Sequence, residues 1–353
     1  MNDPTTDSRD DAWMAQALAE AEKGVGRTAP NPPVGAVVVR NGECLGRGWH
    51  RAAGRPHAER EAIADARRRH GASALAGATI YVTLEPCSSQ GRTPPCTGGI
   101  IEAGITRVVY ACRDENPAHR GRADEILTGE GIEVRSGVCH QHALRLLRPF
   151  FKVRRTGLPW VIWKTAMSID GRLTRPPPEG KWLTSSATRL DVQKLRSTVD
   201  AVLTSGETVR RDRPALTIRV PELLEGRAQP WRVVFSDNPD SLPTDTPLFT
   251  GCRARTLLRP RSGIVESMRA LVAEQGVLTA MVEAGGVFSA VLFEAGLVDE
   301  VVAYMAPVIC GGPVPAVSGP SLPETIRLEE VGYHRIPGAP DVRLRALVAK
   351  SSE

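Results

Sequence analysis

The chain of 353 residues lacks any apolar run long enough to cross a bilayer, which takes about 20 consecutive apolar residues. Its first residues, MNDPTTDSRDD, are polar and acidic, and they lack the apolar stretch of a secretory signal. These absences argue against an integral membrane protein and predict a cytoplasmic location with no membrane contact. Lysine is also scarce, since arginine supplies most of the 45 basic residues.

Cysteines are few and scattered, with seven along the whole chain. An odd and dispersed set, with no secretory signal, argues against a disulfide framework. The thiols are therefore available as metal ligands or as small core residues. The net charge is only +5. A mild positive excess suits a phosphorylated substrate as well as RNA, so charge does not separate these two classes of ligand.

Hydrophobic residues at 41% and charged residues at 24% are ordinary for a globular protein, and the length predicts two domains. Residues 1–10 are expected to form a loose tail. Helical and strand patterns then alternate, with a hairpin at Asn41-Gly42, which predicts an α/β sandwich. FKVRRTGLP at 151–159 is expected to be a linker, and a second α/β run begins at 160–168. We therefore predict domains over residues 10–150 and 158–350.

Three potential zinc ligands and a carboxylate stand in a set order in the first half. His57-Ala58-Glu59 is predicted to open a helix, Cys87 follows a strand, and Cys96 comes nine positions later. One imidazole and two thiolates leave the fourth tetrahedral position of a zinc ion to water, as a catalytic site requires. Glu59 lies close enough to move a proton from that water to a departing amino nitrogen. The sequence predicts one zinc per chain and Glu59 as the catalytic residue.

This order resembles the zinc deaminase signature, H-x-E followed by P-C-x-x-C, although eight residues separate Cys87 from Cys96 here instead of two. Closing the longer loop costs only about a few tenths of a kcal/mol. For any one residue, a surface histidine or a core thiol is the simpler interpretation. The four residues together favour the metal site.

The runs PNPPVGAVVV, HAE and VTLEPCSSQGRTPPC resemble the deaminase half of the bifunctional bacterial enzymes of riboflavin biosynthesis. That half has a cytidine-deaminase-like α/β/α sandwich fold. The resemblance implies that Asn31 lies beside a pyrimidine, and that GRTPPC with Arg92 faces a ribose phosphate. The chain departs from the family at Ser89 and Gln90, where one or two histidines are usual.

The second half carries weaker motifs of its own. Glu283-Ala-Gly285-Gly286 precedes a predicted helix, where phosphate can approach backbone N–H groups, but two glycines before a helix are more often an ordinary loop. No GxGxxG is present. However, KTAMSIDGR, KWLTS, RSTVDAVLTSGETVRRDRPALTIR and VEAGGVFSAVLFEAGLVDEVVAYMAP resemble, in order and spacing, the reductase half of the same enzymes. That half is a dihydrofolate-reductase-like α/β domain that uses NADPH.

The resemblance assigns residues to two sets of binding positions. Paired arginines can hold a phosphate by forked hydrogen bonds, and Glu283 can bond sugar hydroxyls or the amino group that links sugar to ring. Lys164 and Asp170 also have structural interpretations, as an ion-pair partner and a turn residue. The cofactor positions are Ala166, Trp182, Thr208, Asp212, Gly285, Gly286, Val287, Phe288, Ser289, Ala290 and Val291. The substrate positions are Asn31, Gly180, Arg196, Leu216, Arg219 and Glu283.

Three departures from the family lie near these positions. Gly180 stands where a serine is frequent, Ser236-Asp237 stands for Asp-Ser, and Arg213 replaces the second carboxylate of a DDP motif. For Arg213 two interpretations stay open. Its guanidinium either points into solvent or adds a cationic contact to the cofactor phosphates.

The sequence therefore predicts a bifunctional enzyme of riboflavin biosynthesis. Its first half would hydrolyse the 2-amino group of 2,5-diamino-6-(5-phosphoribosylamino)pyrimidin-4-one, and its second half would reduce the ribosyl chain to ribityl with NADPH. A homo-oligomer through the reductase domain is expected by resemblance. The alternatives are a paralogue with one half repurposed, most plausibly the reductase, and a nucleic-acid deaminase with an accessory domain. Against the latter, no RNA-binding motif is present, and no nucleic acid is expected among the partners.

Overall fold

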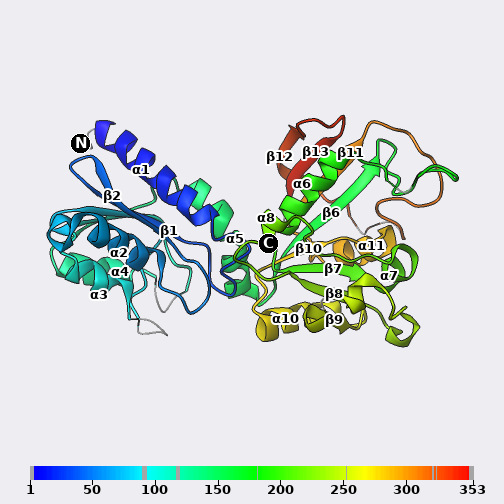
Figure 1. Ribbon diagram of the computed structural model, residues 1–353, viewed down its shortest axis with the longest axis horizontal. Coiled ribbons are helices and arrows are strands. Elements are labelled where there is room, and N and C mark those ends of the chain that lie inside the picture. Colours follow the sequence, from blue (N-terminus) through cyan, green and yellow to red (C-terminus); the bar gives the residue numbers. More distant parts are fainter. Residues whose placement is uncertain are drawn as a thin grey trace. The chain divides into compact units, whose positions relative to one another are not determined.

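The computed structural model describes residues 4–89, 94–116, 120–180, 182–251, 253–319, 322 and 324–349. The chain divides into two compact units, Met1–Thr156 and Gly157–Glu353 (Figure 1). Arg92, which the resemblance places at a substrate phosphate, and Gln90, a departure from the family, lie outside the described residues. Within the described ranges, none of the helices combines the length and the apolar character needed to span a bilayer.

The first unit is built on a five-stranded sheet in the order β2-β1-β3-β4-β5. β1 pairs antiparallel with β2 and β3, whereas β3, β4 and β5 run parallel. Asn41 and Gly42 both have positive φ, at 52° and 75°, and form the two-residue turn that this pair predicts. The strands are β1 (Gly35–Arg40), β2 (Glu43–Trp49), β3 (Thr79–Leu84), β4 (Arg107–Cys112) and β5 (Glu133–Ser136).

Helices cover both faces of this sheet, because alternate strand residues are apolar on each side. Val37, Tyr81 and Val109 face one layer, and Val38, Ile80 and their neighbours face the other. Figure 1 shows α1 and α2 on opposite sides of the strands. The predicted α/β/α sandwich is confirmed. One layer holds α1 (Pro4–Glu22) and α5 (His140–Thr156), and the other holds α2 (Ala58–His70), α3 (Cys96–Glu102) and α4 (Arg122–Gly129), with a 3-10 turn at Ala72–Leu75.

Two expectations about the ends of this unit are wrong. Residues 4–10 are not a loose tail, since α1 begins at Pro4. Asp10 is 1% exposed, and its carboxylate accepts hydrogen bonds from Tyr81, Arg107 and Arg135. The stretch 151–159 is not wholly a linker either. α5 continues to Thr156 and buries Phe151 in the core, because its apolar face runs past residue 150.

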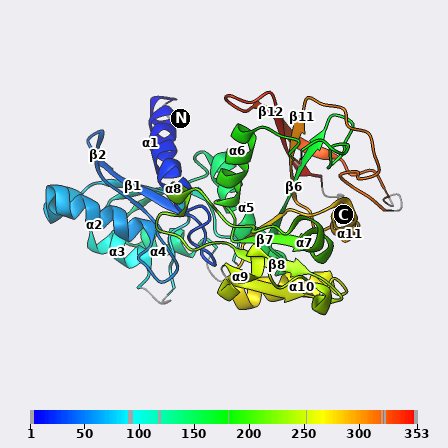
Figure 2. The ribbon, with the colours of Figure 1, turned by 45° about the vertical axis from the view of Figure 1, so that its right-hand side comes forward.

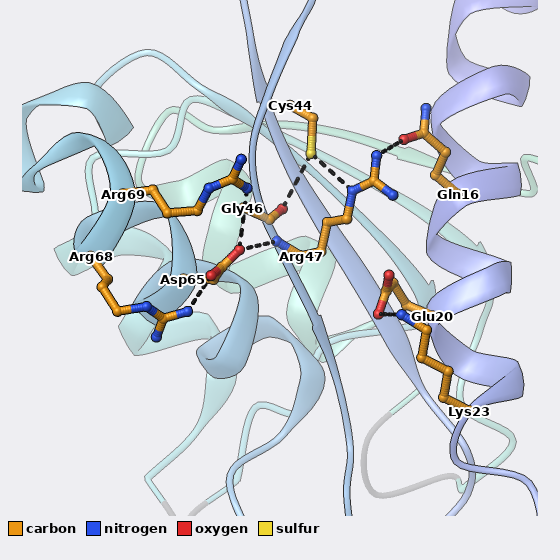
Figure 3. A network of polar contacts seen from close by, with 9 residues as sticks. All are labelled: Gln16, Glu20, Lys23, Cys44, Gly46, Arg47, Asp65, Arg68 and Arg69. Carbon is orange, nitrogen blue, oxygen red and sulfur yellow. Dashed lines mark hydrogen bonds and ion pairs between the residues drawn. The ribbon is translucent and has the colours of Figure 1, made fainter.

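The edge strand β2 is tied to helices on both faces of the sheet (Figure 3). The Asp65 carboxylate on α2 accepts the backbone N–H of Arg47 at 3.0 Å. The Arg47 side chain reaches the other way and donates to Gln16 Oε1 on α1 at 2.7 Å. Arg69 lies 3.5 Å from the same aspartate, and Arg68 also pairs with it. These contacts and the charges around them disfavour pairing of the edge strand β2 with a strand of another chain.

The second unit is built on an eight-stranded sheet in the order β12-β13-β11-β6-β10-β7-β8-β9. The strands from β11 to β9 run parallel, and β13 and β12 add an antiparallel pair at one edge. The strands are β6 (Trp160–Ser168), β7 (Ala201–Ser205), β8 (Trp231–Phe235), β9 (Thr256–Arg259), β10 (Thr279–Val282), β11 (Glu300–Ala306), β12 (Leu328–Arg335) and β13 (Val342–Val348).

Helices again cover both faces of the sheet, and Figures 1 and 2 show α6 and α10 on opposite sides. Met268, Leu271 and Leu292 pack on one face, and Val192, Val209 and other residues pack on the opposite face. This architecture agrees with the predicted α/β class. The helices are α6 (Ser186–Arg196), α7 (Gly206–Asp212), α8 (Pro221–Leu224), α9 (Pro247–Thr250), α10 (Ile264–Gln275) and α11 (Gly286–Glu294), with 3-10 turns at Pro239–Ser241 and Arg253–Arg255.

Candidate functional site

The first unit brings His57, Cys87 and Cys96 together although they come from three separate segments. Nδ1 of His57 lies 3.5 Å from the Cys87 Sγ and 3.4 Å from the Cys96 Sγ. All the candidate ligand atoms of the three residues lie within 4.8 Å of one another. Bonds of about 2.0 Å to nitrogen and 2.3 Å to sulfur at a tetrahedral angle place the two donor atoms about 3.5 Å apart. The three side chains therefore fit one zinc ion.

Local structure explains how each ligand reaches this point. His57 is the extended N-cap of α2, so its side chain leaves the helix at the first turn. Cys96 is the first residue of α3, and its backbone N–H donates to the Cys87 Sγ at 3.3 Å. Upstream of Cys87, the Glu85 carboxylate accepts the N–H groups of Asp114 and Gly121. Glu85 therefore fixes the exit of β3, from which the loop with Cys87 starts.

The electrostatics of the cluster favour a thiolate at Cys87. The neighbouring Cys96 thiol donates a hydrogen bond to its sulfur, and His57 adds to the effect. Together they outweigh desolvation and lower the pKa of Cys87 to about 4. Glu59 is 3% exposed and lies in the first turn of α2, two residues after His57. Desolvation, followed by the charge on Cys87, raises the pKa of Glu59 above its ordinary value.

His50 is a site residue that sequence reasoning missed. It is 2% exposed, and its ring lies edge-on to that of His57 with the centroids 5.4 Å apart. Nδ1 lies 3.0 Å from the carbonyl oxygen of Pro56, which can only accept, so Nδ1 carries the hydrogen. Nε2 therefore accepts from the Asn31 amide at 3.0 Å. This bond places Asn31 close to the metal ligands, and the only sequence signal was a histidine directly after a strand.

In the second unit, Glu283 sits between two cations. Its carboxylate accepts from Nε and Nη2 of Arg196 at 3.0 and 2.5 Å, and the Lys164 ammonium lies 3.4 Å away. Burial opposes the charge on Glu283, but Arg196 and Lys164 outweigh it and hold the pKa of this carboxyl at about 2. Arg196 also donates to the Thr217 carbonyl at 2.6 Å. Three predicted positions, Lys164 among them, thus form one ionised cluster.

Among the described residues, no side chain caps the first turn of α11. Its N-cap, Gly285, has no side chain to accept the backbone N–H groups, whereas Ser205 caps α7 by accepting from Thr208. A Cβ on Gly285 would meet no atom within 4 Å, so the space before the helix is open. A Cβ on Gly286 would lie 2.4 Å from the Pro315 carbonyl oxygen. The Thr208 hydroxyl joins this turn by accepting the Gly285 N–H at 3.3 Å.

The rest of the α11 segment contributes little surface. Phe288, Ser289 and Ala290 are at most 3% exposed. Phe288 packs on Phe235, and Ser289 accepts from the indole of Trp163 at 2.9 Å. Val291 is half-buried against the same core. Within this segment a ligand therefore meets backbone N–H groups and the side chain of Val287, which is 58% exposed.

The remaining predicted cofactor positions lie on separate elements of the second unit. Trp182 is 55% exposed and lies under the Arg189 guanidinium, 4.9 Å from its ring centroid. Ala166 lies on β6 and is half-buried. Asp212 ends α7 and is exposed. Gly180, a predicted substrate position, lies in an exposed loop, and a Cβ there would meet no atom within 4 Å.

The loop after α7 contains two residues with left-handed backbone, Arg213 at φ 47° and Leu216 at φ 53°. The Arg213 guanidinium pairs with Asp245, and both side chains are largely exposed. This position favours the solvent-exposed interpretation of Arg213 over a cofactor contact. Leu216 is 5% exposed and packs in the core, whereas the Arg219 side chain is exposed.

Comparison with known proteins links both halves to one family. Residues 7–112 match the family of the cytidine and deoxycytidylate deaminase zinc-binding region, and residues 159–338 match the RibD C-terminal domain. The riboflavin biosynthesis protein RibD of Haemophilus influenzae is 38% identical over 330 residues, covering 86% of this chain and 87% of that protein. RibD of Mycobacterium tuberculosis is 40% identical over 319 residues, covering 90% of each.

Solved structures give the same result for the fold. Acinetobacter baumannii RibD superimposes with a TM-score of 0.85 at 33% identity, covering 98% of this chain and 100% of that one. The diaminohydroxyphosphoribosylaminopyrimidine deaminase/5-amino-6-(5-phosphoribosylamino)uracil reductase of Thermotoga maritima gives a TM-score of 0.84 at 30% identity, with the same coverage. The similarity runs through both units, so it does not support a chain with one unrelated half.

Proposed function

The chain belongs to the RibD family of riboflavin biosynthesis proteins, and we propose which of its residues carry the family's two reactions. It is a bifunctional enzyme, a deaminase and a reductase that act on a small-molecule substrate. We assign the deaminase to residues 10–150 and the NADPH-dependent reductase to residues 158–350. The observation that carries the proposal is the cluster of His57, Cys87 and Cys96 beside the buried Glu59.

In the deaminase half, the substrate is 2,5-diamino-6-(5-phosphoribosylamino)pyrimidin-4(3H)-one. His57, Cys87 and Cys96 would hold a zinc ion, which would supply the acidity that activates the attacking water. The Glu59 carboxylate lies beside the ligands. It accepts a proton from the attacking water and donates one to the 2-amino nitrogen, which leaves as ammonia while the ring carbon gains an oxygen. Water supplies both the oxygen and the hydrogens, so the step balances.

Asn31 binds the pyrimidine in this proposal, and His50 positions Asn31. His50 is held by the Pro56 carbonyl and fixes the amide of Asn31, so that the amide nitrogen donates to His50. The Asn31 side-chain oxygen then remains as an acceptor for a ring N–H or an exocyclic amino group. Burial lowers the pKa of His50 below its ordinary value, which keeps the ring neutral and able to accept from Asn31.

In the reductase half, NADPH supplies the hydride that turns the ribosyl chain into ribityl. The open first turn of α11 fits its phosphates, because Gly285 and Gly286 leave backbone N–H groups without a side-chain cap. Thr208 holds this turn by accepting the Gly285 N–H. Val287, the most exposed side chain of the segment, would contact the bound cofactor. Ala166, Trp182 and Asp212 complete the proposed cofactor positions.

The substrate positions of this half divide into two groups. Glu283 stays ionised between Arg196 and Lys164, so it accepts hydrogen bonds from sugar hydroxyls. Arg196 uses Nε, Nη1 and Nη2 on Glu283 and Thr217, so we assign it mainly to holding that carboxylate. The exposed guanidinium of Arg219 is assigned to the phosphate. Gly180 and Leu216 complete the proposed set.

The experiment that tests the proposal is a coupled assay of the purified protein. Ammonia release from the diaminopyrimidine reports the first reaction, and loss of NADPH absorbance after addition of the deaminated product reports the second. We expect both activities from one preparation. Ammonia release without any NADPH oxidation would reject the reductase and support a repurposed second half.

We further propose a homo-oligomer through the reductase sheet, a cytoplasmic location and no nucleic-acid ligand. The support for the oligomer is β12, an edge strand on which Leu328, Val331 and Tyr333 are 37%, 43% and 69% exposed. A bare edge of this kind pairs readily with a second copy. Light scattering coupled to size exclusion measures the mass. A monomer at micromolar concentration contradicts this part of the proposal.

A further inference from the structure

The loop between α7 and α8 is held by side chains rather than by a neighbouring strand. Arg232 donates to the Ala215 carbonyl at 3.3 Å, and Arg196 donates to the Thr217 carbonyl at 2.6 Å. These donors come from β8 and α6, which are distant from the loop in sequence. Side chains of other elements therefore hold the backbone of the loop, and each of these side chains can be replaced by mutation.

A further attachment comes from Gln229, which lies before β8 and bonds to Ile218 in both directions. Its Oε1 accepts the Ile218 N–H at 2.8 Å, and its Nε2 donates to the Ile218 carbonyl, also at 2.8 Å. A carboxamide is suited to this task because it carries an acceptor and a donor side by side. The residue after Ile218 is held in a similar way, since Gln193 on α6 accepts the Arg219 N–H at 2.7 Å.

The conformation that these bonds hold is one the loop would not adopt alone. Leu216 has a φ of 53°, a left-handed backbone that branched side chains disfavour. Such residues persist where the surroundings over-determine them. Leu216 and Ile218 are 5% and 3% exposed and point into the core, so the intervening Thr217 and the following Arg219 point outward. Gln229 therefore helps to set where the Arg219 guanidinium stands.

We propose that Gln229 is a positioning residue of the reductase, which holds Arg219 at the substrate phosphate and thereby sets the preference for a phosphorylated substrate. The inference rests on the proposed function, which assigns Arg219 to that phosphate. Among the described contacts, Gln229 bonds only to Ile218. Arg196, in contrast, also bonds Glu283, so its replacement would disturb the loop and the carboxylate together.

The test compares Gln229→Glu and Gln229→Leu with the wild type. Glutamate keeps the size and one acceptor but places a second oxygen against the Ile218 carbonyl, and leucine removes both bonds. The two substrates are 5-amino-6-(5-phosphoribosylamino)uracil and its dephosphorylated analogue. We expect each variant to raise KM about tenfold for the phosphorylated substrate only, with kcat and the KM for NADPH within about twofold of wild type.

A double-mutant cycle with Arg219→Ala separates positioning from general damage. Arg219→Ala should raise the same KM about tenfold or more, and Gln229→Glu should add little in the double variant, because both changes remove one interaction. Gln275→Glu on α10 serves as the matched control, since the side chain of this half-buried glutamine has no hydrogen bond among the described contacts. It should leave both KM values unchanged.

Each outcome decides the inference. Additive effects in the cycle, or equal losses for the two substrates, overturn it and make Gln229 a structural residue. If leucine prevents folding, as a thermal unfolding scan would show, the glutamate variant carries the test. An unchanged KM in Arg219→Ala overturns the inference together with the assignment of Arg219. A raised KM in Arg219→Ala with a normal Gln229→Glu overturns the inference alone.

Discussion

Sγ of Cys96 lies 3.4 Å from Nδ1 of His57, although the two residues are 39 positions apart. This separation is the one that a shared zinc ion imposes on a thiolate and an imidazole. Two helix starts create it, since His57 is the N-cap of α2 and Cys96 opens α3. The metal site is therefore built by the ends of elements, where side chains are free to converge.

Replacement of a ligand should remove the metal and the first activity together. Cys87→Ser is expected to lose zinc, because a neutral hydroxyl is a poor substitute for a thiolate, and ammonia release should fall with it. Elemental analysis of the purified variant measures zinc per chain. Cys44→Ser, a thiol of the same unit outside the cluster, should keep one zinc. Full zinc occupancy in the Cys87 variant would rule out the ligand assignment.

Glu59→Gln should keep zinc and lose deamination. The amide preserves the size of the side chain but cannot carry the proton, so ammonia release should drop by about two to four orders of magnitude. NADPH-dependent reduction of the deaminated intermediate is the internal control, and it should proceed at the wild-type rate. A parallel loss of both activities would mean that Glu59 is needed for folding rather than for chemistry.

Arg213→Asp should leave the cofactor affinity unchanged. The guanidinium pairs with Asp245 at the surface, and exposed pairs of this kind contribute less than about 1 kcal/mol. The KM for NADPH should therefore stay within about twofold of wild type at low salt. A rise of several-fold, together with a weaker salt dependence of NADPH binding, would instead support a cofactor contact.

Asp200→Asn should change how stability depends on pH. Desolvation raises the pKa of Asp200 to about 6, although the N–H groups of Leu278 and Thr279 bond to it. The folded state then binds more protons than the unfolded state between about pH 4 and pH 6, so this carboxyl lowers stability as pH rises through that range. The amide removes the charge and keeps an acceptor.

Thermal unfolding from about pH 4 to pH 8 checks this expectation. The variant should be more stable than wild type at neutral pH, by about 1 kcal/mol, and the two should converge at the acid end. Asp240→Asn, an exposed carboxyl in the same unit, is the matched control and should follow the wild-type curve. A variant less stable than wild type at neutral pH would show that the charge is needed.

The sequence predicted much of this molecule where the signal was local. The predicted stretch 160–168 matches β6 to the residue, and the Asn41-Gly42 pair forms the predicted turn. The elements that escaped prediction are short or lack an apolar pattern. β5 has four residues with no buried position, and β12 is exposed along most of its length. Such strands are specified by their neighbours, which a linear pattern does not contain.

The candidate site divides in the same way. Metal ligands such as His57 and Cys87 can be predicted from residue type and spacing. His50, Gln193 and Gln229 cannot, because their roles depend on hydrogen bonds to backbone groups that a residue pattern does not identify. Nor does the sequence show that Leu216 adopts a left-handed backbone, which only its packed surroundings impose.

The carboxylate of Asp10 determines how far the chain can be shortened. It lies between Arg107 on β4 and Arg135 on β5, whose side chains are 18% and 29% exposed. A truncated enzyme that starts at Asp11 would leave two guanidinium charges facing each other without their shared counter-charge, at a cost of roughly 3 kcal/mol or more. An affinity tag or fusion partner should therefore be placed before α1, with the helix kept intact. Deletion into α1 would remove the ion pairs that join this helix to β4 and β5.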